Sequence, residues 1–254
     1  MKHSKKVFIS ILNWNKVGDT IECLDSILAM NYPNYVVIVV DNASSDGSPL
    51  IIRKKYPQVI LIENRENLGF TCGNNIALRF AINRGADYVW LLNNDAIVEV
   101  DTLSLLIDVA ENSPSIGLIS PTINDYHDHS NAQFRGSYFD RKNCEVKDPN
   151  NNLDEVDPKF QTGGNVCLWG TALLIKRSVI KRIGYLNEKY FAYMEDFDYS
   201  IRALKAGFRN VLYPHARIFH KNNPYSDKIK PPYFYYYQLR NLYLLREENS
   251  QGWR

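Results

Sequence analysis

The first 120 residues alternate between short apolar runs and segments with helical periodicity, and this alternation most constrains the fold. The apolar runs are rich in β-branched and aromatic residues without polar alternation, which is typical of strands buried on both faces of a sheet. Repeated strand–helix units of this length predict a mostly parallel, doubly wound α/β sheet with helices on both faces. We expect strands at residues 7–12, 35–40, 59–62, 88–92 and 116–119, and helices at 20–29, 49–56, 75–84 and 102–112.

The regular alternation ends near residue 121. Residues 122–164 are rich in Asn, Asp, Gly and His and predict a long irregular stretch, with an evident loop, DPNNNLDEVDP, at 148–158. Such stretches inside a compact domain more often serve function than merely connect elements. Further strands are expected at 166–175, 211–213 and 217–219. Further helices are expected at 177–183, 196–206 and 233–248, the last of them dense in aromatic residues.

The charge balance and the cysteine content exclude several classes of protein. Thirty basic residues against 28 acidic ones leave a formal net charge of +2, which gives no reason to expect a nucleic-acid partner. The four cysteines form no CxxC pair, so neither a zinc knuckle nor a disulfide framework is indicated, and a reduced setting fits best. No apolar stretch reaches the roughly 18 residues of a membrane span. We therefore expect a cytoplasmic protein that is soluble or touches a membrane without crossing it.

Polar side chains follow three of the predicted strands, at Asn13, at Asp41 and at Asn93-Asn94-Asp95. Ligands of doubly wound sheets bind beyond the carboxyl ends of the strands, so these side chains are candidates for a binding site. Neither GxGxxG nor GxxxxGK[ST] occurs, which disfavours a dinucleotide site and a P-loop. Asp95 closes an apolar run, where its carboxylate oxygens could bind Mg²⁺ or Mn²⁺. Asn-Asn-Asp is also well suited to a plain turn.

Two further polar positions have both a structural and a functional interpretation. Glu195 and Asp196 begin a predicted helix, where acidic residues cap the first turn and complement the helix dipole. The same dipole is expected to keep an Asp196 carboxyl deprotonated at neutral pH. His220 ends a predicted strand, and a lone histidine in such a place usually has a structural role. Taken one at a time, these residues leave both interpretations open.

Eight fragments of the chain are informative together. In chain order they are ILNWN, VVDNASSDGS, ENLGFTCGNN, WLLNND, WGTALLIKR, YFAYMEDFDYSIRALKAGF, RIFH and QLRN. Together they resemble family-2 glycosyltransferases of the GT-A fold, most closely the rhamnosyltransferase-like branch that builds bacterial surface polysaccharides. The resemblance extends from about residue 7 to residue 246, nearly the whole chain. Their joint occurrence outweighs the structural interpretation of each fragment alone.

The resemblance implies which residues bind the nucleotide-sugar. Asp41 would contact the nucleobase, and the segment around Asn13 would line the same pocket. Ala77 is a departure, because the family leads us to expect glycine there, although a small residue is kept. The residues that the resemblance assigns to the nucleotide-sugar site are Asn13, Asp41, Asn67, Gly69, Asn75, Asn93, Asn94, Trp169 and Gly170.

The resemblance also implies a metal site and a catalytic pair. Asp95 and His220 would hold a divalent cation, Mn²⁺ or Mg²⁺, with Asn93 standing where the family's DXD motif often has an acid. Asp196 matches the catalytic base and Glu195 its supporting neighbour. The cation would stabilise charge on the leaving diphosphate as a Lewis acid. The base would take the proton of the attacking hydroxyl on the opposite side, which inverts the anomeric configuration.

The function so implied is an inverting, metal-dependent glycosyltransferase. It would move a sugar from dTDP-L-rhamnose or a UDP-sugar to a saccharide or lipid-linked acceptor. Residues 1–225 would form the GT-A catalytic domain. Residues 226–254 would form an aromatic helical segment that either packs on this domain or contacts the cytosolic face of a bacterial membrane.

Two other functions are weighed against this one. A sugar-phosphate nucleotidyltransferase would usually carry a Gly-rich N-terminal loop with a basic residue, which VFISILNWNKVGDT lacks. A non-catalytic sugar-binding module on the same fold is disfavoured because Asp95, Asp196 and His220 are all retained.

Overall fold

The computed structural model describes residues 4–140, 143, 145–147, 166–222 and 229–250. Its first half is the predicted strand–helix alternation. α3 begins at Gly69 rather than near Asn75, because its first turns carry no apolar stripe that periodicity could detect. The elements are β1 (Val7–Asn13), α1 (Val17–Leu28), β2 (Tyr35–Asp41), α2 (Ser48–Lys55), β3 (Ile60–Glu63), α3 (Gly69–Asn83), β4 (Tyr88–Asn93), β5 (Ala96–Val98), α4 (Thr102–Glu111) and β6 (Ile116–Asp125).

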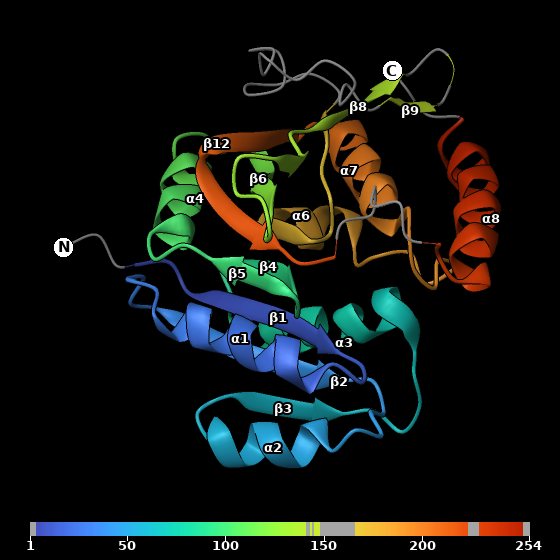
Figure 1. Cartoon of the computed structure of the whole chain (residues 1–254). Coiled ribbons are helices and arrows are strands. Elements are labelled where there is room, and N and C mark those ends of the chain that lie inside the picture. The colour runs from blue at the N-terminus through green and yellow to red at the C-terminus, as the bar shows by residue number, and fades with distance from the viewer. Residues whose placement is uncertain (1–3, 141–142, 144, 148–165, 223–228, 251–254) are drawn as a thin grey trace.

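The main sheet contains nine strands (Figure 1). Its order is β3-β2-β1-β4-β11-β6-β12-β5, with β7 (Ala132–Phe134) paired to β6, and with β11 at Ala172–Lys176 and β12 at Arg209–His220. β1 runs parallel to β2 and β4, and β2 runs parallel to β3. Because parallel crossovers are right-handed, α1 and α2 cover one face and α3 covers the other. The predicted doubly wound sheet is confirmed, and antiparallel β11 makes its second half mixed.

Three expectations for the second half were wrong in detail. The strands expected at 211–213 and 217–219 are one strand, β12, with an irregularity between Tyr213 and Arg217 at Pro214, which has no N–H to donate. The strand expected at 166–175 is divided into β10 (Val166–Cys167) and β11 by the turn that contains Gly170. The stretch expected to be irregular carries β7, β8 (Ser137–Asp140) and β9 (Glu145–Lys147), and a small sheet has the order β10-β8-β9. The loop expected at 148–158 lies outside the described residues.

Three helices complete the described structure: α6 (Arg177–Ile183), α7 (Glu195–Lys205) and α8 (Pro232–Asn249). α8 lies beside α7 at the edge of the molecule (Figure 1). Its inner face buries Asn241, Leu245 and Asn249, whereas Leu239 and Tyr243 on its outer face are 62% and 71% exposed. Among the described helices, none combines the length and the hydropathy needed to cross a membrane.

Candidate active site

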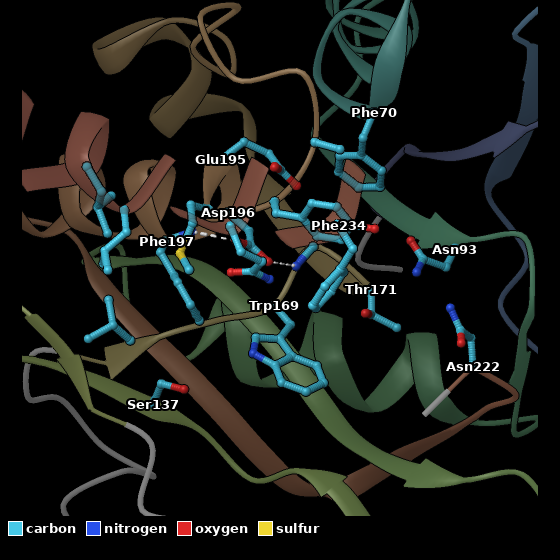
Figure 2. Close-up of a pocket in the computed structure, with 18 of the residues that line it drawn as sticks. Phe70, Asn93, Ser137, Trp169, Thr171, Glu195, Asp196, Phe197, Asn222 and Phe234 are labelled. Carbon is cyan, nitrogen blue, oxygen red and sulfur yellow. Dashed lines mark hydrogen bonds between the residues drawn. The ribbon is translucent and has the colours of Figure 1, made fainter. Parts of the chain in front are cut away.

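A cavity of about 790 Å³ lies among the end of β4, the turn before β11, the start of α7 and the inner face of α8. Its lining comes from distant parts of the chain. In Figure 2, Asp196 lies between Phe197 on one side and Asn93 with Asn222 on the other. The residues of the predicted site that line this cavity are Asn93, Trp169, Gly170, Glu195, Asp196 and His220.

Asp196 is held by two backbone N–H groups. Gly170 N donates to Asp196 Oδ2 at 2.8 Å, and Phe197 N donates to Asp196 Oδ1 at 2.8 Å. A Cβ on residue 170 would lie 3.2 Å from Cζ of Phe70 and 3.5 Å from Cβ of Asp196. Glycine at this position therefore lets the turn approach the carboxylate closely.

The helix dipole was expected to keep the Asp196 carboxyl deprotonated by lowering its pKa, but burial has the larger effect. Burial raises the pKa of Asp196 above its ordinary value, although the N–H groups of Gly170 and Phe197 act in the opposite direction. A raised pKa makes the carboxylate a stronger proton acceptor than an exposed aspartate, which suits a general base.

Glu195, which lies beside Asp196, is a buried carboxyl. Burial and the neighbouring charge of Asp196 raise the pKa of Glu195 well above its ordinary value of 4.5. Among the described residues, Glu195 Oε2 has no hydrogen-bond partner. A buried polar atom without a partner is costly, so Glu195 is a candidate functional residue of this cavity.

The register of β12 against β5 brings Asp95 and His220 together. His220 pairs with Ala96, the residue that follows Asp95. Asp95 Oδ1 lies 3.1 Å from His220 Nε2, and both side chains are largely buried. Burial alone would raise the pKa of Asp95, yet the adjacent His220 and Lys221 hold that pKa below its usual range. The Asp95 carboxylate is therefore ionised at neutral pH.

Gln133 orients the His220 ring. Its amide nitrogen donates to Asp125 Oδ2 at 3.1 Å and to the backbone oxygen of His220 at 2.9 Å. Its carbonyl oxygen therefore faces His220 Nδ1, which lies 2.9 Å away and must carry the proton of this hydrogen bond. The other ring nitrogen, Nε2, faces Asp95: it donates to the carboxylate when it carries a proton, and it can bind a cation when it does not.

The Asp95 carboxylate fits a divalent cation that is bound mainly by phosphate and water, the mode that Mg²⁺ favours, and the His220 imidazole is a ligand better suited to a transition metal such as Mn²⁺. Adjacent ligands of an octahedral ion at about 2.1 Å lie roughly 3.0 Å apart. The observed separation of 3.1 Å is close to this value. In the part of the chain that the structure describes, no cluster of three or more His, Cys, Asp or Glu side chains could hold a metal ion.

Asn13, Asp41 and Asn94 form a separate, buried network at the carboxyl ends of β1, β2 and β4. Asn13 Nδ2 donates to Asp41 Oδ2 at 2.6 Å, and Asn94 Nδ2 donates to Thr20 Oγ1 at 2.9 Å. Asp41 is 1% exposed and also accepts hydrogen bonds from the amide and hydroxyl of Ser44. These contacts shape the loops that follow the strands. The contact of Asp41 with a nucleobase stays a prediction.

Asn67, Gly69 and Asn75 lie at and within the first turns of α3. Asn67 Oδ1 accepts the N–H of Gly69 at 2.9 Å. Gly69 has φ +76°, and a Cβ there would lie 2.5 Å from the backbone oxygen of Phe191, so no other residue fits. The Asn75 amide is engaged with the backbone of Leu186, at 2.9 and 3.0 Å, and therefore holds the chain after α6.

Three polar residues of these networks were not identified from the sequence. Asn42 Nδ2 donates to the backbone oxygen of Gly69 at 3.0 Å, Gln133 orients His220, and Asn241 of α8 contacts the chain before Glu195. Asn42 and Asn241 lie inside two of the eight fragments that carry the family resemblance, VVDNASSDGS and QLRN. Gln133 lies in a stretch without an interpretable pattern, so no sequence signal could have identified it.

The sequence model of the family described as "Glycosyl transferase family 2" matches residues 9–184 of this chain. That match covers more than half of the chain. The protein belongs to glycosyl transferase family 2. It is therefore a glycosyltransferase, and the nucleotidyltransferase alternative is not favoured.

Two relatives show where this family-2 glycosyltransferase lies among characterised proteins. It is 26% identical over 239 residues to the N-acetylglucosaminyl-diphospho-decaprenol L-rhamnosyltransferase of Mycobacterium tuberculosis, an alignment that covers 85% of this chain and 76% of that protein. It is 21% identical over 267 residues to the dTDP-rhamnosyl transferase RfbF of Shigella flexneri, covering 97% and 81%. The resemblance to rhamnosyltransferases of polysaccharide synthesis is thereby confirmed.

Solved structures confirm the GT-A fold of this glycosyltransferase. The mannosyltransferase PcManGT from Pyrobaculum calidifontis, solved with GDP-Man and Mn²⁺, matches with a TM-score of 0.67 and 21% identity over 96% of this chain and 70% of that one. GalNAc-T7, solved with UDP, GalNAc and Mn²⁺, matches with a TM-score of 0.72 and 15% identity over 96% and 48%. At these identities the likeness concerns the fold alone.

Proposed function

We propose that this family-2 glycosyltransferase is an inverting, divalent-cation-dependent enzyme with dTDP-L-rhamnose as its favoured donor. Its acceptor is a saccharide or lipid-linked saccharide of surface polysaccharide synthesis. One observation carries the proposal: a single cavity is lined by Asp196, the proposed base, and by His220, which contacts Asp95. The names of the two rhamnosyltransferase relatives support the choice of donor over a UDP-sugar.

Asp196 is the proposed general base. Its carboxylate lines the cavity, and the N–H groups of Gly170 and Phe197 fix its orientation. An acceptor hydroxyl is a poor nucleophile at neutral pH, so Asp196 removes its proton as the new bond to the anomeric carbon forms. The nucleoside diphosphate leaves from the opposite face of the sugar, and this direct displacement inverts the anomeric configuration.

Glu195 is the proposed neighbour that positions the base. Burial and the charge of Asp196 raise the pKa of Glu195, which favours the protonated form of Glu195 beside an ionised Asp196. Two adjacent carboxyls with different roles are a familiar way to run acid and base chemistry in one site.

Asp95 and His220 are the proposed protein ligands of the cation. When bound, Mn²⁺ or Mg²⁺ supplies Lewis-acid stabilisation of the negative charge on the departing diphosphate. The ionised Asp95 carboxylate contributes charge, and Gln133 keeps the Nε2 lone pair of His220 on the same side. Asn93, whose amide nitrogen lies 3.4 Å from His220 Nε2, contributes a polar group to the same wall.

α8 is proposed to form the acceptor side of the cavity and to meet a membrane surface with its other face. Phe234, Gln238 and Leu242 of α8 line the cavity. Tyr236, Leu239 and Tyr243 point away from the domain, and amphipathic aromatic rings suit the interface at which a lipid-linked acceptor lies. The segment 226–254 would thereby place the enzyme peripherally on the cytosolic face of a bacterial membrane.

The experiment that tests the proposal measures nucleotide release from a panel of donors without acceptor. With dTDP-L-rhamnose and Mn²⁺ we expect slow release of dTDP, which stops on addition of EDTA and is faster than release of UDP from UDP-sugars. Adding acceptor should produce a glycoside of inverted configuration. Release of pyrophosphate, release that EDTA does not affect, or a retained configuration would contradict the proposal.

A further inference from the structure

The chain enters α7 through a turn with an unusual backbone. Tyr193 and Met194 have φ values of +70° and +69°, a region that non-glycine residues rarely adopt. Two such residues in succession lie directly before Glu195 and Asp196. Strain of this kind persists only where the surroundings impose it, and it occurs preferentially at functional sites.

Asn241 of α8 makes the polar contacts that hold this turn. Its amide nitrogen donates one hydrogen bond to the backbone oxygen of Ala192 and one to that of Tyr193, each at 2.7 Å. Asn241 is fully buried. Because both N–H bonds of its NH₂ group are used on consecutive carbonyls, the carbonyls of Ala192 and Tyr193 both point toward α8.

Aromatic contacts from α8 support the same turn. The ring of Tyr237 stacks on Phe191 with centroids 5.1 Å apart, and Phe234 contacts Tyr193 edge to face at 5.1 Å. Figure 2 shows Phe234 in the same cavity as Asp196.

The segment 191–194, which contains this turn, is attached to α3 at its first residue. The backbone oxygen of Phe191 accepts the N–H groups of Phe70 and Thr71 at 2.8 and 3.3 Å. At its last residue the segment leads into α7, where Met194 O accepts the N–H of Asp198 at 2.9 Å. The segment 191–194 is therefore fixed between α3, α7 and α8, and only α8 supplies side-chain amide donors to it among the described contacts.

We infer that Asn241 is a positioning residue of the active site: it imposes the left-handed turn at Tyr193 and Met194 and thereby aims Asp196 into the cavity. This rests on the proposed role of Asp196 as the base. With this role for Asn241, α8 is part of the active site and not a separate C-terminal segment. A displacement of the base by about 1 Å can lower turnover about 10²-fold, so a small relaxation of the turn has a large effect.

The decisive experiment is a double-mutant cycle with Asn241→Ala and Met194→Gly. Glycine adopts positive φ without strain, so it removes the need for an external clamp. In the wild-type background we expect Asn241→Ala to lower kcat about 10- to 100-fold, with dTDP affinity in the presence of Mn²⁺ unchanged. In the Met194→Gly background the same substitution should lower kcat by less than about threefold, because the coupling between the two sites is lost.

Asn249→Ala is the matched control. Asn249 is also a buried asparagine on the inner face of α8, but its amide nitrogen donates to Asp198 Oδ1 and to Leu245 O, and its side-chain oxygen accepts from Lys205 Nζ. It should lower the melting temperature without changing kcat per folded molecule. Hydrogen exchange of peptides spanning 190–200 supplies a readout independent of activity, and it should accelerate in Asn241→Ala only.

Each outcome decides the inference. Equal losses of kcat in both backgrounds, or a loss that Asn249→Ala reproduces, would show that Asn241 only docks α8. An unchanged kcat in Asn241→Ala, alongside an inactive Asp196→Asn enzyme, overturns the inference and leaves the proposed function intact. An active Asp196→Asn enzyme instead overturns the role of the base itself.

Discussion

Asp95 Oδ1 and His220 Nε2 lie 3.1 Å apart, although the two residues come from distant parts of the chain. β12 makes this possible, because its last residue pairs with the strand that begins directly after Asp95. The contact meets the geometric condition for two ligands of one ion.

We expect His220→Ala to weaken Mn²⁺-dependent binding of dTDP, and Asp95→Ala nearly to abolish turnover. Asp95 supplies the negative charge, whereas His220 supplies a neutral donor, so the loss of Asp95 should cost more. Titration calorimetry with dTDP, in Mn²⁺ and in EDTA, separates metal-dependent binding from binding of the nucleoside. Equal affinities in both conditions for wild type and variants would remove the metal site from the proposal.

Gln133→Leu should weaken Mn²⁺ binding about 10- to 100-fold, the usual effect of losing a hydrogen-bond partner behind a metal-bound histidine. Leucine cannot accept the Nδ1–H of His220, so the ring loses its fixed tautomer and orientation. Electron paramagnetic resonance of free and bound Mn²⁺ in the presence of dTDP measures this directly. An unchanged Mn²⁺ affinity would show that the contact only stabilises the fold.

Asp196→Asn should lower transfer by about 10²-fold or more while leaving donor and metal binding nearly intact, because the amide keeps the shape but cannot accept a proton. Glu195→Gln should cost less, since the proposed role of Glu195 is to position its neighbour. A purely structural cap predicts another pattern, with about 0.5–2 kcal/mol of stability lost and turnover per folded molecule unchanged. Melting temperature and turnover are therefore measured on the same two variants.

Glu195 should also make the stability of the fold depend on pH. Its pKa is raised in the folded state, so above pH 4.5 the folded protein holds a proton that the unfolded chain has lost. The folded state then binds more protons than the unfolded state, and the free energy of unfolding falls as pH rises through the raised pKa. Glu195→Gln removes this dependence, so its melting temperature should rise relative to wild type as pH increases. A constant difference across the pH range would contradict the buried, protonated state.

The outer face of α8 can be tested without disturbing its inner face. Serine at Tyr236, Leu239 and Tyr243 replaces side chains that are 61%, 62% and 71% exposed, so the fold should be retained. We expect the triple variant to lose binding to vesicles that contain anionic lipid, as measured by co-sedimentation, because the apolar contact with the interface is gone. A chain ended near Pro232 is a poorer test, since it also removes buried Leu245 and Asn241. Undiminished vesicle binding by a folded triple variant would end the membrane proposal.

Much of the architecture was predictable because its signals are local. Doubly buried strands and amphipathic helices leave periodic patterns, and β1 to β4 follow them closely. The antiparallel pairing of β11 was harder to predict, because the partners of a strand are set by the whole sheet and not by the strand's own residues. The start of α3 was missed because GFTCGNN packs small and polar residues where a helix usually shows an apolar stripe.

The sequence by itself determined the family and the candidate residues, because eight fragments in a characteristic order are more specific than any single one. Only the tertiary structure decided how those residues are used. It buries Glu195 and partly buries Asp196 so that their pKa values rise, whereas the helix dipole considered from the sequence would lower them. It also brings Gln133 to His220 and Asn241 to the turn before α7. Burial, strand register and the packing of one helix on another depend on contacts between distant segments, which no local pattern records.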